Sequence, residues 1–178
     1  MIYRYHTRND SPAIAELFAS VFTDSEGEAE GALIGQLAKN LFEKTDEHDL
    51  FNFVADDDGR IIGSIFFSRL DFGNGTEAFI LAPVAVHSDY QGQGIGQALI
   101  NYGLGELKDK GVSVVLTYGD PMFYNKVGFL QINHHTIKAP FKLSQPEGWL
   151  GQSLAGDSIK TLSGSCTCVE ALSNPVYW

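Results

Sequence analysis

The chain has 178 residues, of which 44% are hydrophobic and 19% are charged, as in an ordinary globular protein. Its net charge of −10 argues against nucleic acid as a partner, because neutralising phosphates requires clustered lysine and arginine. No apolar run is long enough to span a bilayer, the N-terminus does not resemble a signal peptide, and two cysteines imply no disulfide framework. We therefore expect one domain over residues 1–178, cytoplasmic and without a membrane or nucleic-acid partner.

The N-terminal part of the chain predicts a strand and two helices. Residues 1–7 alternate in the manner of an edge strand. A helix then begins at Asp10 or Ser11, either of which can act as its N-cap, with Pro12 in the tolerated first turn. The acidic segment 24–30 is expected to break this helix before a second one. Each helix has one apolar stripe, formed by Ile14, Leu17, Phe18, Val21 and Phe22 in the first and by Leu33, Ile34, Leu37, Leu41 and Phe42 in the second.

The remaining elements predict a mixed sheet with further helices. A hairpin joins residues 51–55 to 61–67 through an aspartate-rich turn that ends in glycine. A third strand, 78–86, leads through a glycine-rich loop into a helix, and 112–117 reads as a buried strand before a short helix at Met122. Residues 149–154 and 165–172 are expected as the final strands. The order β-α-α-β-β-β-α-β-α-β-β indicates a mixed α/β (α+β) fold.

The most informative stretch of the sequence is Val84–Ile100, where a β-branched run passes through three alternating glycines into a helix. Glycines let a ligand approach the backbone, and the helix that follows presents unpaired N–H groups and the positive end of its dipole. This junction therefore predicts an anion site, most often one for phosphate.

The spacing of the glycines distinguishes among phosphate-binding loops. A dinucleotide fingerprint fails because Gln97 stands where the third glycine belongs, and an NTPase loop fails because no Lys-Ser or Lys-Thr follows. The pattern Q/R-x-x-G-x-G/A is satisfied by Gln91, Gly94 and Gly96. This pattern resembles the acyl-CoA pyrophosphate loop of the GNAT superfamily of N-acetyltransferases.

A second motif supports the same resemblance. Tyr124-x-x-x-Gly128-Phe129 is similar to the last part of the GNAT core. Together with L-A-P-V-A-V before the glycines and G-D-P before the tyrosine, it resembles the bacterial YhbS-like branch over residues 78–130. The resemblance implies a single GNAT-type domain whose central mixed sheet has its fourth and fifth strands splayed, with helices on both faces.

The resemblance also implies acetyl-CoA as co-substrate and assigns residues to it. Main-chain N–H groups of the loop would cradle the pyrophosphate, and the strand before it would bond to the pantetheine arm as an added strand does. The residues so assigned are Val84, Ala85, Val86, Gln91, Gly92, Gln93, Gly94, Ile95, Gly96 and Gln97. Pro83 cannot donate to a strand ladder, which fits a strand that separates from the neighbouring strand. A main-chain N–H near Val86 would stabilise the oxyanion that forms when the amine attacks the thioester. Tyr124 would protonate the leaving thiolate, the alternative being that it only packs against the sulfur end of the cofactor.

A general base does not emerge from the sequence. Ile80 stands where some family members carry glutamate, and none of the remaining candidates is singled out by spacing: Glu28, Glu30, Asp71, Glu77, His87 and Asp120. The acids of segment 24–30 either bind a cationic acceptor or complement a helix dipole. We expect no metal, because Cys166 and Cys168 lack two further ligands and His134 and His135 would point to opposite faces of a strand.

The sequence thus predicts an acetyl-CoA-dependent N-acetyltransferase whose partner is a primary amine on a small molecule or peptide, attacked directly in a ternary complex. The alternative is a catalytically silent module that binds or senses acyl-CoA, and a more distant one is a Rossmann-type nucleotide-binding domain. The sequence does not decide whether the chain forms a homodimer, and it does not identify the acceptor.

Overall fold

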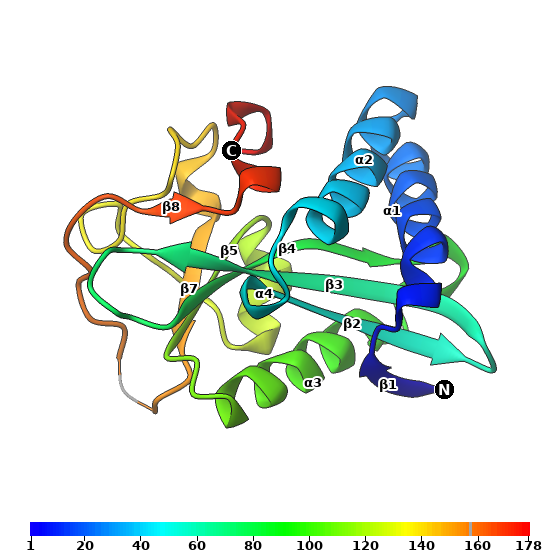
Figure 1. The fold of residues 1–178 in the computed structure, drawn as a ribbon, viewed down its shortest axis with the longest axis horizontal. Coiled ribbons are helices and arrows are strands. Elements are labelled where there is room, and N and C mark those ends of the chain that lie inside the picture. Colours follow the sequence, from blue (N-terminus) through cyan, green and yellow to red (C-terminus); the bar gives the residue numbers. More distant parts are fainter. Residues whose placement is uncertain (157) are drawn as a thin grey trace. The chain divides into compact units, whose positions relative to one another are not determined.

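The computed structural model describes residues 1–156 and 158–178 (Figure 1). They form two compact units. Unit 1 comprises Met1–Phe66 and Pro83–Gly103, and unit 2 comprises Phe67–Ala82 and Leu104–Trp178. The boundary falls within secondary-structure elements, so two strands and one helix belong partly to each unit. The expectation of a single domain over residues 1–178 stays a prediction.

The strands form one mixed sheet in the order β1-β2-β3-β4-β5-β7-β6, with β8 paired to β3. Strand β1 lies at the edge, as predicted, and pairs antiparallel with β2. Strands β4 and β5 are parallel, whereas β5 pairs antiparallel with β7. This confirms the expected mixed α/β class. The strands are β1 (Ile2–Tyr5), β2 (Leu50–Asp57), β3 (Arg60–Asp71), β4 (Ala78–Val86), β5 (Val114–Tyr118), β6 (Leu130–Gln131), β7 (Trp149–Ser153) and β8 (Thr167–Cys168).

In the described residues the α-helices are α1 (Ser11–Glu26), α2 (Glu28–Lys44), α3 (Ile95–Asp109) and α4 (Pro121–Tyr124). Asp10 is the N-cap residue of α1, with Pro12 in the first turn, as the sequence predicts. The predicted break between the first two helices falls within the acidic segment 24–30 and consists of Gly27 alone. Gly27 has φ +100°, which residues with a side chain rarely adopt, so one glycine is enough to reverse the chain. None of the helices in the described part of the chain is both long and apolar enough to cross a membrane.

Helices α1 and α2 lie side by side in close contact (Figure 1). Two glycines of α2, one turn apart, permit the approach. A Cβ on Gly35 would lie 2.8 Å from the Cβ of Ala19, and one on Gly31 would overlap the Thr23 hydroxyl and come within 2.5 Å of the Ala19 carbonyl oxygen. The absence of side chains at these two positions therefore sets the distance between the helices.

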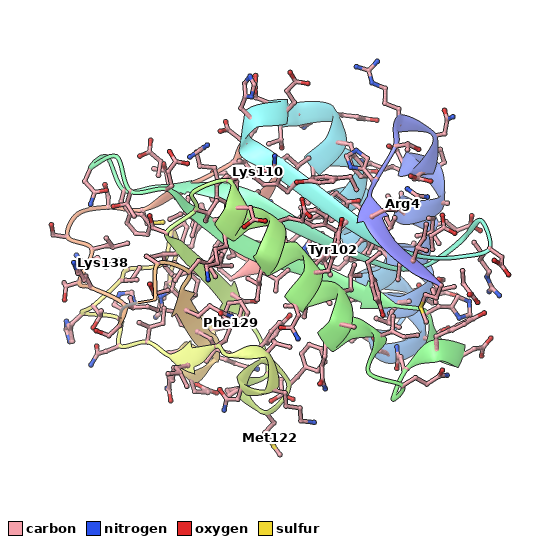
Figure 2. All side chains as sticks on the ribbon, turned by 90° about the horizontal axis from the view of Figure 1, so that it is seen from below. Arg4, Tyr102, Lys110, Met122, Phe129 and Lys138 are labelled. Carbon is pink, nitrogen blue, oxygen red and sulfur yellow. The ribbon has the colours of Figure 1, made fainter. Side chains whose placement is uncertain are left out.

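In unit 1 the helices cover both faces of the strands, as the resemblance implies (Figures 1 and 2). On one face Phe66 of β3 packs against Phe18 of α1 and Phe42 of α2, with ring centroids 5.6 and 4.9 Å away. On the other face Phe53 of β2 meets Tyr102 of α3 edge-on at 5.6 Å. The alternation of side chains along β2 and β3 thus supplies two separate apolar contacts.

Several local expectations need correction. The hairpin turn is shorter than the aspartate run, because only Asp58 and Gly59, both with positive φ, lie between β2 and β3. His134 and His135 lie in a turn, so the strand expected there is wrong. The last expected strand, 165–172, shrinks to the two residues of β8 and ends in a 3₁₀ turn. The two-residue β6 was not predicted, since so short a strand has no measurable period.

An ionic cluster ties β1 to the start of α1 and the end of β2 in unit 1. The Arg4 guanidinium donates to Asp10 Oδ2 at 2.8 Å and to Asp56 Oδ2 at 2.8 Å. Asp10 also accepts the Thr7 N–H at 2.6 Å. Hydrogen bonds from Arg4 lower the pKa of Asp10 to about 2, and they also lower the pKa of Asp56.

We predict that Arg4→Met lowers the free energy of unfolding by about 1–2 kcal/mol at pH 7, a figure reduced for partial exposure. A carboxylate with a lowered native pKa stabilises the fold above its unfolded pKa of about 3.9 and loses this effect as the pH falls toward its native value. The difference between wild type and variant should therefore shrink between about pH 5 and pH 2 in urea titrations. Arg8→Met, which removes an exposed charge, is the control, and an equal loss in both variants contradicts the prediction.

Candidate active site

Strand β4 leaves β5 before it reaches the glycines. The parallel pairs between these two strands run from Ala78 with Val114 to Leu81 with Thr117, and no later residue of β4 has a partner on β5. Pro83 follows two residues after the last pair and has no N–H to donate to a ladder. The structure thereby agrees with the expected splaying of the fourth and fifth strands.

After Pro83, the side chains of β4 in unit 1 alternate between buried and half-buried. Ala85 is buried, and its carbonyl lies close to Gly63 of β3, whereas Val84 and Val86 are half-buried. The main-chain N–H of His87 donates to the Ile62 carbonyl at 2.8 Å, so the end of β4 remains anchored to β3.

The glycine loop, Gln91–Gln97, follows β4, runs into the first turn of α3 and has an unusual backbone. Gly92 has φ +75° and Gly94 has φ +78°, while a Cβ on either would meet nothing within 4 Å. The glycines are therefore required by the backbone conformation, and the space beside them is open. Ala98 is the first residue of α3 whose N–H bonds back, to the Gly94 carbonyl at 3.0 Å. The preceding amides of the first turn have no intrahelical acceptor, which is the arrangement that binds anions.

Two glutamines of the loop have structural contacts of their own. The Gln91 side chain donates from Nε2 to the Val86 carbonyl at 2.9 Å, and the Gln93 side chain donates to the Asp89 carbonyl at 3.3 Å. Gln91 thus fixes the loop to the last residue of β4. Gln91, the first residue of the glycine motif, therefore binds the main chain of the protein itself, a role that the spacing of the motif did not indicate.

Four side-chain contacts within unit 1 hold the segment that precedes the loop. Ser88 donates to Asp24 of α1 at 2.6 Å, and the Tyr90 hydroxyl donates to Asp57 at 3.5 Å. Arg60 at the start of β3 donates to Nε2 of His87 at 2.9 Å and also lies over the Tyr90 ring. The entry to the glycine loop is therefore fixed by α1, β2 and β3 together.

In unit 2, Tyr124 closes α4 within a tight aromatic cluster. Its ring lies edge-on to Phe123 at 5.1 Å and to Phe129 at 5.8 Å. A Cβ on Gly119 would come within 2.7 Å of the Tyr124 ring, so glycine is needed where the chain leaves β5. The Tyr124 side chain is half-buried, and desolvation by burial raises the pKa of the phenol.

Thr117 of β5 is a buried polar residue that sequence reasoning did not single out. It is the last residue of β5 paired with β4, is fully buried, and donates from Oγ1 to the Leu81 carbonyl at 2.8 Å. In the sequence Thr117 belongs to a β-branched run, which predicts packing and gives no sign of a polar contact.

Four of the six candidate bases have structural partners. Glu77 accepts from Arg69 at 2.7 Å, Asp71 accepts the Gly73 N–H at 2.7 Å, and Asp120 caps α4 through the Met122 N–H at 2.9 Å. The fourth, His87, binds Arg60 as described above. For Glu28 and Glu30, at the start of α2, the structure adds only their place in the first turn, where acids complement the helix dipole.

The cysteines do not form a reactive pair. Cys166 is buried, which raises the pKa of its thiol to about 12, and burial also raises the pKa of Cys168. Among the residues that the structure describes, no group of three or more histidine, cysteine, aspartate or glutamate side chains could hold a metal ion.

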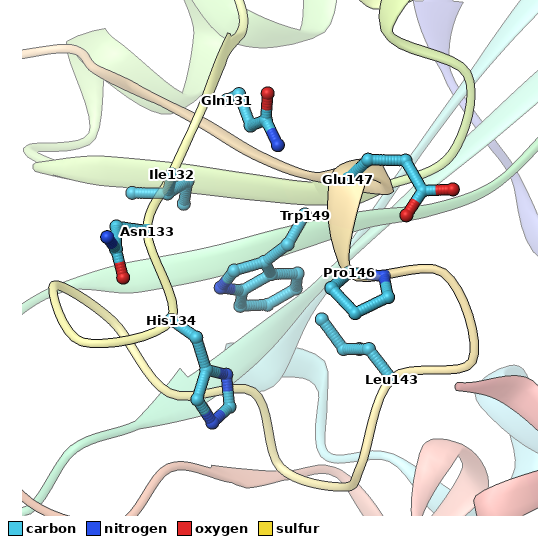
Figure 3. A pocket seen from close by; sticks show the side chains of 8 residues that line it. All are labelled: Gln131, Ile132, Asn133, His134, Leu143, Pro146, Glu147 and Trp149. Atoms are coloured by element: carbon cyan, nitrogen blue, oxygen red, sulfur yellow. The ribbon is translucent and has the colours of Figure 1, made fainter.

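Unit 2 also contains an open groove of about 400 Å³ between the segments 131–134 and 143–149 (Figure 3). Its floor is the buried Trp149, whose indole N–H donates to the Ile137 carbonyl at 2.9 Å. Glu147 lies at the rim and points away from the indole (Figure 3). None of the predicted site residues lines this groove, which is formed by Gln131, Ile132, Asn133, His134, Leu143, Pro146, Glu147 and Trp149.

Comparison with known proteins gives a consistent result. The family model of the acetyltransferase (GNAT) domain matches residues 48–131. The chain is 30% identical over 165 residues to the uncharacterized N-acetyltransferase YhbS of Escherichia coli K12, covering 92% of this chain and 93% of that protein. It is 29% identical over 140 residues to the uncharacterized N-acetyltransferase YjhQ of the same organism, covering 75% and 77% of the two chains.

Solved structures show the same likeness. The crystal structure of the GNAT family N-acetyltransferase YhbS from Escherichia coli in complex with CoA has a TM-score of 0.80 at 29% identity, covering 97% of this chain and 92% of that chain. A GNAT family acetyltransferase from Brucella melitensis in complex with acetyl-CoA has a TM-score of 0.69 at 24% identity and covers 96% of each chain. At that lower identity the second likeness concerns the fold alone.

Proposed function

The chain belongs to the GNAT family of acetyltransferases, and from this premise we propose that it transfers an acetyl group from acetyl-CoA to a primary amine of a small molecule or peptide. The observation that carries the proposal is the glycine loop: two positive-φ glycines with open space beside them, directly before the unpaired amides of α3.

The main-chain N–H groups of the glycine loop and of the first turn of α3, all in unit 1, suit the pyrophosphate of acetyl-CoA. The first-turn amides of α3 and those of the glycine loop supply N–H donors to an anion, and the helix dipole favours its negative charge. We propose that Gly92, Gln93, Gly94, Ile95, Gly96 and Gln97 bind the pyrophosphate through these amides. The backbone of β4 at Val84, Ala85 and Val86 has no partner on β5 and suits the amides of the pantetheine arm, while Gln91 fixes the loop to the end of this strand.

When bound, acetyl-CoA supplies an acyl thioester that an amine can attack directly. A main-chain N–H near Val86 stabilises the developing oxyanion. Tyr124 acts as the general acid, giving the proton of its hydroxyl to the departing sulfur. A phenol with a raised pKa remains protonated at neutral pH and is available for this role. The base that takes the proton of the amine stays unassigned.

Turnover with an acceptor distinguishes an enzyme from the alternative, a catalytically silent acyl-CoA-binding module. We expect release of free thiol from acetyl-CoA with at least one member of a panel of primary amines and peptides. We also expect CoA to raise the melting temperature. Tight CoA binding without turnover on any acceptor would favour the silent module, and stabilisation by NAD in place of CoA would favour a nucleotide-binding domain.

We predict that Tyr124→Phe lowers kcat by about 10- to 100-fold, because the thiolate must then take its proton from water. The rise in melting temperature caused by CoA should stay as in wild type, since the phenol is not proposed to bind the nucleotide. Tyr3→Phe removes a hydroxyl in β1 and serves as the control. Unchanged kcat in Tyr124→Phe would assign the phenol to packing.

The remaining expectations become part of the same proposal. We propose that the chain is a single domain over residues 1–178 in the cytoplasm, with the amine as its small-molecule or peptide partner and without nucleic acid. A homodimer can be tested by sedimentation at several protein concentrations, with and without CoA.

A further inference from the structure

We propose that Arg60, the first residue of β3, binds the 3′-phosphate of CoA and so lets the chain distinguish CoA from a ligand that lacks this group. The inference rests on the proposed function, in which the glycine loop holds the pyrophosphate of the same ligand. Its basis lies within unit 1, where the Arg60 guanidinium contacts two residues of the segment that leads into the loop, His87 and Tyr90.

The charge of Arg60 has no counterpart nearby in the sequence of unit 1. Residues 45–66 and 83–103, which hold β2 and the glycine loop, contain no other lysine or arginine. Arg4 of β1 is already bonded to Asp10 and Asp56. CoA carries several phosphates, and an acidic protein repels such a ligand unless a cation offsets its charge. Arg60 is therefore the side chain in this part of the chain that can attract it.

Arg60 is held in place without being neutralised. Its guanidinium carbon lies 5.8 Å from the centroid of the Tyr90 ring, and its Nη2 lies 2.9 Å from Nε2 of His87. These are its contacts with the described residues, and neither partner is a carboxylate. A guanidinium has several N–H donors in a planar fork, which matches a phosphate while its face stacks on an aromatic ring. The contact with His87 leaves most of these donors available to an anion.

His87 allows Arg60 to change partner without leaving another donor unsatisfied. Its Nδ1 lies 3.2 Å from the main-chain N of Asp89, which donates to it, while its Nε2 faces Arg60. An imidazole has one nitrogen lone pair when neutral and none when protonated. His87 can therefore accept only one of these two N–H groups at a time. When Arg60 turns to a phosphate, His87 still accepts the Asp89 amide.

The 3′-phosphate is the group of CoA that suits this side chain. The pyrophosphate is proposed to bind main-chain amides, which Arg60 does not supply. A phosphate monoester carries a charge of about −1.5 to −2 at pH 7 and accepts two parallel N–H bonds from one guanidinium. Arg60 is exposed and lies outside the loop, so it binds such a group without competing for the loop amides.

The test compares CoA with dephospho-CoA, which lacks only the 3′-phosphate, in calorimetric titrations at low ionic strength. We expect wild type to bind CoA about tenfold more tightly than dephospho-CoA. Arg60→Met should weaken CoA binding to the level of dephospho-CoA and leave the affinity for dephospho-CoA as in wild type. Arg60→Lys should keep part of the difference, because an ammonium retains the charge without the planar fork.

Arg8→Met is the matched control. It removes another exposed arginine of unit 1 and changes the net charge by the same amount. We expect it to keep the full difference between the two ligands, which separates a local contact from the overall charge of the protein. All variants are first checked for an unchanged fold by circular dichroism and by melting temperature without ligand.

Three outcomes overturn the inference while the proposed function stands, because wild type binds the cofactor in each. The first is equal affinity of wild type for the two ligands, and the second is an unchanged difference in Arg60→Met. The third is an equal loss of both ligands in Arg60→Met, which would show that Arg60 acts on the glycine loop through His87 and Tyr90. Wild type that binds neither ligand overturns the proposed function together with the inference.

Discussion

Gly94→Asp is expected to weaken CoA binding by at least about 100-fold, and so to abolish the rise in melting temperature that CoA causes. The substitution adds a carboxylate beside the amides proposed to hold the pyrophosphate, where a like charge repels the ligand. A Cβ at Gly94 would have no neighbour within 4 Å, so the substitution begins in open space. The measurement is calorimetric titration with CoA, supported by thermal melting with and without the ligand.

Gly94→Asn separates charge from backbone strain. Gly94 has φ +78°, so any side chain there is strained, but asparagine has the size of aspartate, tolerates this conformation and carries no charge. We expect Gly94→Asn to keep measurable CoA binding that Gly94→Asp lacks. If both variants fold and bind CoA equally, the pyrophosphate does not lie beside Gly94. Gly73→Asp, at an exposed loop glycine with φ +70°, gives the cost of strain alone.

The part of the candidate site around the glycine loop could be predicted from the sequence, because the residues proposed to bind the cofactor follow one another along the chain. Strand β4, the glycine loop and the start of α3 follow one another within a few positions, and the structure places their bounds where the pattern predicts them. Side-chain partners could not be predicted, because they join distant positions. The Gln91 contact with Val86 and the Thr117 contact with Leu81 depend on strand register, which hydrophobic pattern constrains only to one face or the other.

The same distinction explains the errors in the fold. Long periodic segments such as α2 and β4 have enough repeats to determine their type. The described residues between 130 and 178 form short strands and turns, so tertiary contacts decide their structure. Trp178 illustrates this: it is buried, stacks on Tyr118 at 6.4 Å and donates its indole N–H to the Leu172 carbonyl at 2.9 Å. Nothing in the local sequence indicates that these residues meet.

Gly31→Val is expected to lower the free energy of unfolding by more than about 3 kcal/mol, because its side chain must displace α2 from α1. A Cβ at this position would overlap the Thr23 hydroxyl and lie 2.5 Å from the Ala19 carbonyl oxygen, and a helix backbone cannot yield as a flexible side chain can. Urea denaturation followed by circular dichroism measures the effect. The variant should also lose CoA affinity, since Asp24 at the end of α1 holds Ser88 just before the glycine loop.

Ala32→Val is the matched control, because it places the same β-branched side chain on the exposed face of the same helix. Its cost should be the helix propensity alone, below about 1 kcal/mol. A loss of similar size in both variants would mean that α1 and α2 can separate at Gly31 without cost. In that case the one-residue reversal at Gly27 would hold the two helices together, and the glycines of α2 would not. A large loss at Gly31 with unchanged CoA affinity would show that the Asp24–Ser88 contact does not support the glycine loop.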